Sequence, residues 1–425
     1  MEAGKYGWRS IRLRLFALFA LVIACVLYYA IADLARQWQA RSTLSASVRL
    51  SEFSVHLSGL IHELQKERGL STGFVGSGGS NFRVELDAQR SESDRHRAAL
   101  QSWVAESAAL PPAVVAALDT AGRSLAALAG KRSEVGSLSL SSGAAFGYYS
   151  DTIGDLLAVL ERSAAAAEAA ELVRDMTTYL MFVSAKEQAG RERAALNGLF
   201  AANQRASLEL HRRVIAIITA QDVHLDGFRA RAPEQWADAL DGVLRSAVGV
   251  EAERLRQQAL ERMEFGYFAV EPAHWFETIT SKINGMKEVE DLIAGDITRQ
   301  TAALLKAANW QLALAVALCV LAAALALVFG LLVSTVLTGL HRVALAAQGV
   351  AAGRLADEIP VHDDNELGEI EQALAAVRNN VQAMIDDAGM LSQAAIDGRL
   401  ATRADAGRHQ GDFRRIVEGV NGTLD

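Results

Sequence analysis

Two arginines occur where the amphipathic pattern of a helix predicts an apolar side chain. Apolar residues recur at steps of three and four from Leu50 to Leu64, the spacing of one buried helix face, and Arg68 continues that face. Arg193 continues a similar face that begins at Leu172. Neither arginine has a carboxylate three or four residues away. Because a buried guanidinium needs a counterion, we expect the missing anion to be a ligand or a carboxylate from another helix.

A small planar oxoanion is the ligand that this chemistry favours. A guanidinium presents a planar fork of donors that meets two oxygens together, so two converging forks would select both charge and shape. Gly69 follows Arg68, and Gly190 lies one turn before Arg193, so the helix backbones can approach closely at both arginines. Lys186 is a third candidate ligand residue, although a side chain of its length can also reach solvent.

The alternative partner of either arginine is a carboxylate brought in by folding, for which Glu63, Glu67 and Asp175 are candidates. Arg191 differs from the other two arginines because Glu187 lies four residues before it. For Arg191 we therefore expect an ordinary ion pair along one helix.

Two apolar segments stand out in a chain of 425 residues with 51% hydrophobic residues. Residues 15–32 and 310–340 contain no charge, and each is long enough for a hydrocarbon core that needs roughly 20 apolar residues. Basic residues before the first segment, among them Lys5, Arg9 and Arg12, predict a cytoplasmic amino terminus and an external middle region. A cleaved signal peptide ending near Ala32 is the alternative.

Other functional classes are disfavoured by composition. The formal charge of -8 and the lack of a basic stripe argue against a nucleic-acid partner. The two cysteines, Cys25 and Cys319, lie in the apolar segments, and His56 and His62 do not share a helix face, so we expect no disulfide and no metal site in the middle region. Without a catalytic signature, we expect neither an enzyme nor a cofactor.

The fold class is predicted to be all-α. Prolines are few, helix-forming residues fill long windows, and turn signals are sparse between residues 33 and 309. We expect about eight helices there, packed as two antiparallel bundles and flanked by two transmembrane helices.

The region after residue 340 has a coiled-coil pattern. Three- and four-residue steps of apolar residues run to Val350, Gly353 interrupts them, and they resume at Leu367. The connector resembles the HAMP linker of bacterial receptors through Gly353-Arg354-Leu355, Pro360 and Glu366-Leu367-Gly368, although no proline stands near Gly339. The resemblance implies a parallel bundle in a homodimer, with signal relay through Gly353, Pro360, Glu366, Leu367 and Gly368. A plain coiled-coil stalk is the alternative.

A repeat at an offset of about 45 residues extends this pattern. Residues 352–356 recur as 397–401, which predicts a second, incomplete HAMP-like unit. The last residues, 409–425, resemble the segment that precedes the signalling domain of methyl-accepting chemotaxis proteins.

The two arginine segments resemble the nitrate- and nitrite-sensing domain of bacterial receptors and regulators. Residues 65–71 match its first motif; Lys186-Glu187, Gly190 and Glu192-Arg193-Ala194 match its second. The resemblance implies that Arg68 and Arg193 bind the anion, one from each motif; Lys186 is a weaker candidate from its charge and position alone. Only these segments of residues 35–308 match specifically.

These observations together predict a bacterial transmembrane chemoreceptor in the inner membrane. The predicted parts are an amino terminus with a first transmembrane helix (1–34), a periplasmic sensing domain (35–308), a second transmembrane helix (309–337), a HAMP domain (338–388) and an incomplete HAMP-like unit (389–425). The expected partners are nitrate or nitrite, a second copy in a homodimer, the lipid bilayer, and a chemotaxis kinase and adaptor if a signalling domain follows. The alternatives are the sensor part of a histidine kinase or nucleotide cyclase, and a stalk without a ligand.

Overall fold

The computed structural model describes residues 11–107, 110–362 and 364–423, and every regular element in them is helical. The prediction of an all-α fold is therefore confirmed. Of the basic residues used to predict the orientation of the amino terminus, Lys5 and Arg9 lie outside the described residues, as does the side chain of Arg12. The chain divides into two compact units, residues 34–315 and residues 1–33 with 316–425.

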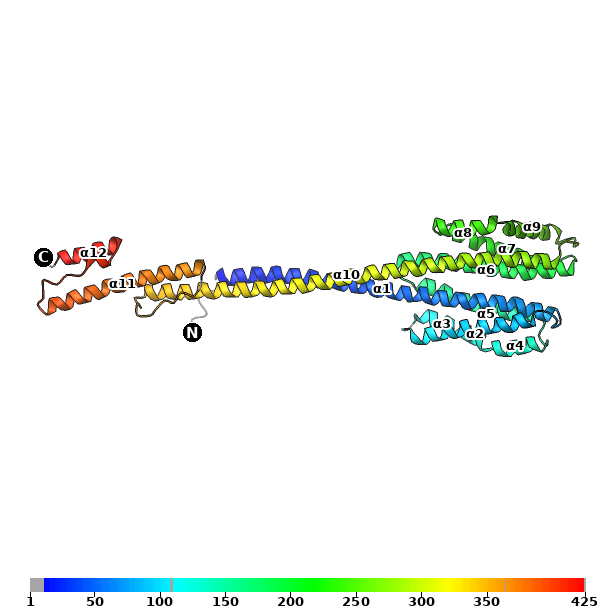
Figure 1. The fold of residues 1–425 in the computed structure, drawn as a ribbon, viewed down its shortest axis with the longest axis horizontal. Helices are drawn as coiled ribbons and strands as arrows, with labels where there is room; N and C mark the ends of the chain where they lie inside the picture. Colours follow the sequence, from blue (N-terminus) through cyan, green and yellow to red (C-terminus); the bar gives the residue numbers. More distant parts are fainter. Residues whose placement is uncertain (1–10, 108–109, 363, 424–425) are drawn as a thin grey trace. The chain divides into compact units, whose positions relative to one another are not determined.

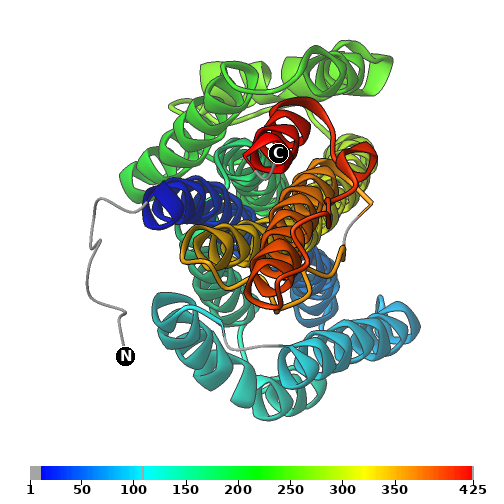
Figure 2. The ribbon, with the colours of Figure 1, turned by 90° about the vertical axis from the view of Figure 1, so that its left-hand side faces the viewer.

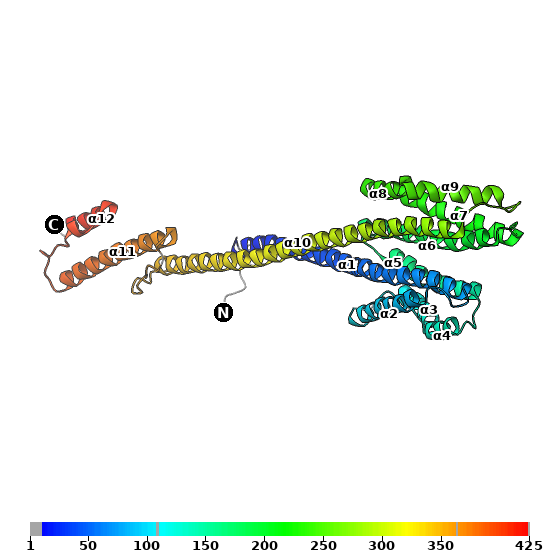
Figure 3. The ribbon, with the colours of Figure 1, turned by 45° about the vertical axis from the view of Figure 1, so that its right-hand side comes forward.

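Ten helices or parts of helices build the unit of residues 34–315 and fall into two groups of five (Figures 1 and 3). The first group contains α1 (Ile11–Gly76), α2 (Arg83–Glu106), α3 (Pro112–Ala126), α4 (Leu128–Gly136) and α5 (Ser142–Ala166). The second contains α6 (Ala170–Ala202), α7 (Leu208–Arg229), α8 (Glu234–Arg245), α9 (Ala247–Arg262) and α10 (Pro272–Ala351). Viewed end-on, the green helices α7 to α9 and the light blue and cyan helices α2 to α4 lie on opposite sides (Figure 2).

Local sequence explains where several of these helices begin. The hydroxyl oxygens of Ser141, Ser207 and Ser246 each accept a backbone N–H from the first turn of the helix that follows, which satisfies a donor the helix cannot pair itself. Helix α3 starts at Pro112, whose missing N–H costs nothing at a first helical position. Asn203 ends α6 in the left-handed conformation, with φ of 46°.

The hydrophobic core runs through both groups. The predicted apolar faces of α1 and α6 are buried in it, including Phe53, Leu57, Met176 and Val183. Both faces therefore point inward, as their three- and four-residue spacing predicts. Arg68 and Arg193 continue these two faces, so both arginines lie in the interior between the two helix groups.

The carboxyl-terminal region contains helix, connector and helix in the predicted order. Helix α10 ends at Ala351, Gly353 adopts a φ of 73° that favours glycine, and α11 (Glu366–Ile396) begins with Asn365 as its cap. Gly398, which corresponds to Gly353 in the repeat, has the same conformation with φ of 74°. A short 3-10 turn (Ala406–Arg408) and α12 (Gly411–Gly422) follow. The HAMP assignment and the homodimer remain predictions.

Three segments, Phe16–Gly76, Pro112–Gly136 and Pro272–Ala351, are long and apolar enough to cross a membrane by length and composition alone. The most apolar windows of the first and third have no buried residues. Within the terminal unit these two helices touch, because the rings of Phe19 and Phe329 lie 4.9 Å apart. Pro112–Gly136 belongs instead to α3 and α4, and Val114 and Leu128 from this segment pack in the bundle core.

Candidate anion site

Arg68 on α1 and Arg193 on α6 lie close together in the unit of residues 34–315. A Cβ atom added to Gly190 would stand 2.8 Å from Nη2 of Arg68, and one added to Gly69 would stand 2.9 Å from Nη2 of Arg193. Each guanidinium therefore occupies the space left by the glycine of the other helix, as the sequence suggested when it placed a glycine near each arginine. Arg68 is 1% exposed, whereas Arg193 is only partly buried and retains access to solvent.

Each arginine is flanked by an aromatic ring and a hydroxyl from its own helix group. The guanidinium of Arg68 stands over the Phe146 ring at 5.0 Å and donates to Oγ of Ser150 at 2.9 Å. That of Arg193 stands over the Phe276 ring at 5.1 Å and donates to Oγ1 of Thr280 at 3.1 Å. A ring face attracts a cation, and the ring and the hydroxyl together fix the direction of each fork.

Arg68 has a carboxylate partner that the sequence did not suggest. Its Nη1 and Nη2 donate to the two oxygens of Glu187 at 2.6 and 3.0 Å, and this carboxylate also accepts from Gln65 at 2.9 Å and from Nε of Arg191 at 2.7 Å. The predicted pair of Glu187 with Arg191 is thus confirmed. Burial alone would raise the pKa of Glu187, but the charges and hydrogen bonds of Arg68 and Arg191 outweigh it and lower the pKa.

Arg193 has no such partner. Among the described residues, no carboxylate lies within ion-pair distance of its guanidinium, and the hydroxyl of Thr280 is its polar side-chain contact. Burial, together with the neighbouring charge of Arg68, lowers the pKa of Arg193 to about 10. An anion beside the guanidinium would offset both effects, because an opposite charge favours the protonated form.

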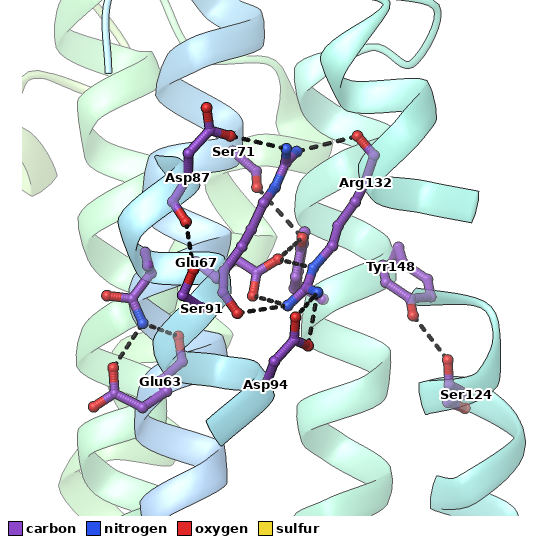
Figure 4. A network of polar contacts seen from close by, with 12 residues as sticks. Glu63, Glu67, Ser71, Asp87, Ser91, Asp94, Ser124, Arg132 and Tyr148 are labelled. Atoms are coloured by element: carbon purple, nitrogen blue, oxygen red, sulfur yellow. Dashed lines mark hydrogen bonds and ion pairs between the residues drawn. The ribbon is translucent and has the colours of Figure 1, made fainter. Parts of the chain in front are cut away.

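The carboxylates proposed from the sequence as partners have other uses. Glu67, which is fully buried, accepts from Nε and Nη2 of Arg132 at 2.7 and 2.9 Å and from the hydroxyl of Tyr149 at 2.7 Å. Figure 4 shows Arg132 between Glu67 and Asp94. Glu63 pairs with Lys66 at 2.9 Å, and Asp175 pairs with Arg174 at 3.3 Å.

The second helix group repeats this ion pair. Glu192 directly precedes Arg193, as Glu67 precedes Arg68, and it accepts from Nε and Nη2 of Arg256 at 2.7 and 2.6 Å. Arg132 lies on α4 and Arg256 on α9, the fourth helix of each group. Each glutamate is neutralised within its own group, so neither competes for the central arginines.

Lys186 does not reach solvent, although its side chain is long enough to do so. It is buried and forms an ion pair with Glu290 on α10, and its Nζ lies 3.4 Å from Nδ1 of His62. Ser58 donates to the same glutamate at 2.8 Å. Burial lowers the pKa of Lys186 more than Glu290 raises it. Its role as a ligand residue remains a prediction.

The matched surroundings of the two arginines were missed from the sequence, although signals for them exist. The dipeptide Glu-Arg occurs in both motifs, and the ring and hydroxyl positions share one spacing, Phe146 to Ser150 and Phe276 to Thr280. These features show a two-fold pattern only when α5 and α10 are known to face the arginines. The matched surroundings of Arg68 and Arg193 are therefore recognised from the contacts in the structure and not from the sequence alone.

Comparison with known proteins identifies the family of this chain. Residues 59–298 match the family model for nitrate and nitrite sensing, and the chain belongs to that family. A nitrate regulatory protein of Klebsiella oxytoca is 29% identical over 270 residues, which cover 60% of this chain. The chain spans 66% of the length of that relative. The structure of the NasR transcription antiterminator superposes with a TM-score of 0.59 at 23% identity, covering 82% of this chain and 94% of that one, and so shares its fold.

These relatives correct several predictions. A nitrate regulatory protein and a transcription antiterminator contradict the identification as a membrane chemoreceptor, its function in chemotaxis, and its placement in the inner membrane with residues 35–308 in the periplasm. The physical reason is that hydropathy measures only how apolar a helix is. Pro112–Gly136 passes the same test as the terminal segments, yet part of its apolar surface packs inside a bundle.

The relatives also bear on the partners and the class of protein. Both are named as regulators, which is consistent with a protein that is not an enzyme. Neither comparison supports the expected absence of a nucleic-acid partner. Net charge averages over the whole chain and does not describe a local surface, so it was a weak ground for that expectation.

Proposed function

We propose that this chain is a nitrate- or nitrite-responsive regulatory protein in which the anion binds between Arg68 and Arg193. The observation that carries the proposal is the state of Arg193, a partly buried cation beside a second guanidinium. It has a ring and a hydroxyl around it, and no carboxylate of the described residues lies within ion-pair distance. Membership of the nitrate and nitrite sensing family supports the choice of anion.

The chemistry of the site favours a small, flat, singly charged oxoanion. Two guanidinium forks can each meet two oxygens, and charge-assisted hydrogen bonds of this kind are about twice as strong as neutral ones. The rings of Phe146 and Phe276 stand against the guanidinium faces, so the fork edges are the parts of both groups that can meet an anion. Gly69 and Gly190 leave room for the guanidinium group of the opposite helix, so both forks can come close to one another between α1 and α6.

The output that we propose is gene regulation, as in the named functions of the relatives. Anion binding changes an output only to the extent that the anion prefers one arrangement of the helices over another. Helices α1 and α6 each supply one arginine, so their relative position is what the anion senses. We further propose residues 35–308 as the sensing domain, and the connector with Gly353, Pro360, Glu366, Leu367 and Gly368 as a HAMP-like relay.

Calorimetric titration of the full chain with sodium nitrate, and separately with sodium nitrite, tests the proposal. Sodium chloride at matched ionic strength is the control for general salt effects. We expect saturable heat with nitrate or nitrite and none with chloride. Arg193→Ala should weaken binding by about 30- to 150-fold, since a hydrogen-bonded charge contributes about 2 to 3 kcal/mol.

A matched variant separates the site from overall charge. Arg213 on α7 is 61% exposed and pairs with Glu209, so Arg213→Ala removes the same charge far from the site and should leave the affinity unchanged. Undiminished nitrate binding in Arg193→Ala, or no heat in the unaltered chain at millimolar anion, would contradict the proposal.

A further inference from the structure

We infer that the Glu187 carboxylate is a built-in competitor of the ligand: the anion takes its place on Arg68, and Glu187 remains paired with Arg191. This inference rests on the proposed function and adds a residue that sets the affinity and shape selectivity of the same site. It predicts that the site is occupied by a carboxylate of the protein whenever no oxoanion is bound.

Geometry is the first support. A carboxylate and a nitrate ion both present two coplanar oxygens at the separation that a guanidinium fork accepts. Glu187 uses both of its oxygens on Nη1 and Nη2 of Arg68, at 2.6 and 3.0 Å. The protein thus already demonstrates, with its own side chain, that a planar two-oxygen anion fits this fork.

The two-fold pattern is the second support. The rings, the hydroxyls, the glycines and the neutralised glutamates all occur once in each half, and Glu187 is the exception. Glu187 precedes Glu192 by the same distance along the chain as His62 precedes Glu67, so the position equivalent to Glu187 in the first half holds His62. Arg193 therefore lacks the carboxylate that Arg68 has.

Charge balance is the third support. Arg68 and Arg191 both pair with Glu187, and Arg193 lies beside Arg68 without a paired carboxylate, while Glu67, Glu192 and Glu290 are engaged by other cations. The cluster has an excess of positive charge, which favours the uptake of an anion rather than a neutral ligand. An exchange of Glu187 for nitrate on Arg68 keeps every carboxylate paired.

Arg191 makes the exchange feasible. Its Nε lies 2.7 Å from Oε1 of Glu187, and the side chain is 31% exposed, so the guanidinium can follow the carboxylate as it leaves Arg68. Removing one partner from a buried pair is costly because the other charge is left uncompensated. Here Glu187 is never left without a cation, which lowers the cost of displacement.

The test compares nitrate titrations of the unaltered full chain with those of Glu187→Gln, which keeps the shape and removes the charge. We expect nitrate affinity to rise by about tenfold or more, corresponding to about 1.4 kcal/mol. The melting temperature without nitrate should fall, because Arg68 loses its counterion, and the rise produced by nitrate should become larger.

A control variant and a more conservative substitution of Glu187 complete the experiment. Asp175 is also a buried carboxylate on α6 but pairs with Arg174, so Asp175→Asn should leave the nitrate affinity unchanged. If Glu187→Gln does not fold, Glu187→Asp serves instead, since it keeps the charge but is too short for both contacts, and its nitrate affinity should also rise.

The outcomes separate the two proposals. Absence of nitrate binding in the unaltered chain overturns the proposed function itself. If the unaltered chain binds nitrate and the Glu187 variants bind it equally or more weakly, the site stands and the competitor role is wrong, because Glu187 would then support the ligand or act independently of it.

Discussion

Gly190 and Arg68 fit together across the two helix groups: the guanidinium fills the place where any other residue at position 190 would carry its Cβ atom. Gly69 and Arg193 have the same relationship in the opposite direction. Glycine is unfavourable within a helix by roughly 0.5 to 1 kcal/mol relative to alanine. Its presence at both points indicates that room for the guanidinium groups outweighs helix stability here.

Gly190→Ala should therefore separate stability from binding. The added methyl displaces the flexible end of Arg68 from its pair with Glu187, and we expect nitrate affinity to change by about tenfold or more, while the gain in helix propensity offsets part of the lost stability. Calorimetry and urea unfolding measure the two effects. Gly198→Ala, in the same helix but with open space around it, should raise stability and leave nitrate binding unaltered. Equal effects of both substitutions on binding would refute the packing argument.

Arg132 offers a comparison between a buried and an exposed partner of one side chain. Arg132→Met leaves the buried Glu67 carboxylate with the Tyr149 hydroxyl and no cation, and we expect the free energy of unfolding to fall by about 3 to 5 kcal/mol. Asp94→Asn removes the other partner, which is 55% exposed, and should cost less than about 1 kcal/mol. Denaturant titrations of both variants measure the two free energies of unfolding. Similar losses of stability would show that burial does not determine how much each ion pair contributes.

His62 should make the fold sensitive to acid. Burial, and next the charge of Lys186, lower the pKa of His62 to about 2 in the folded state from 6.5. Below pH 6.5 the unfolded chain binds a proton that the folded chain does not, so stability is complete above that pH and decreases as the pH falls. At pH 5 the contribution lost is up to about 2 kcal/mol.

The test of the His62 prediction compares how the free energy of unfolding depends on pH in the unaltered chain and in a His62 variant. Urea unfolding at pH 7 and pH 5 should show a smaller loss of stability in His62→Gln, which has no group to protonate, than in the unaltered chain. Carboxylates elsewhere titrate equally in both chains and cancel. Identical pH dependence would mean that His62 is protonated in the folded state.

Lys186 should stabilise the fold as the counterion of the buried Glu290, and its predicted part in the anion site can be tested separately. Lys186→Met leaves Glu290 buried, with the more distant Lys287 at 3.6 Å, and should cost about 3 kcal/mol or more. Adding Glu290→Gln should recover much of that loss, because no buried charge then remains unpaired. Nitrate affinity of the double variant should stay within about threefold of the unaltered chain. A much larger loss would return Lys186 to the anion site.

The sequence predicted the positions of the central arginines but not their surroundings. Helical periodicity relates residues three and four apart, so it placed Arg68 and Arg193 on buried faces and paired Arg191 with Glu187. The contact of Arg68 with Glu187 joins residues 119 apart and depends on how α1 packs against α6. No local pattern contains that information.

The apolar segments illustrate the same limit. Composition predicted that residues 15–32 and 310–340 form helices with apolar surfaces, and the structure contains them within α1 and α10. What covers such a surface is not a property of the segment itself, since lipid, another helix and a second chain are all apolar partners. The prediction of a membrane receptor was therefore wrong because composition does not tell which partner covers an apolar helix.

The matched halves have a consequence for how such a sensor can be tuned. Two identical subunits meeting at a symmetric site must change both copies of a residue together, so each half would carry either a glutamate or a histidine at the position of Glu187 and His62. One chain that contains both halves escapes this constraint. A substitution at either position changes how strongly a side chain of the protein competes with the anion for an arginine. The anion concentration that half-saturates the site then changes, while the two arginines that bind the anion stay the same.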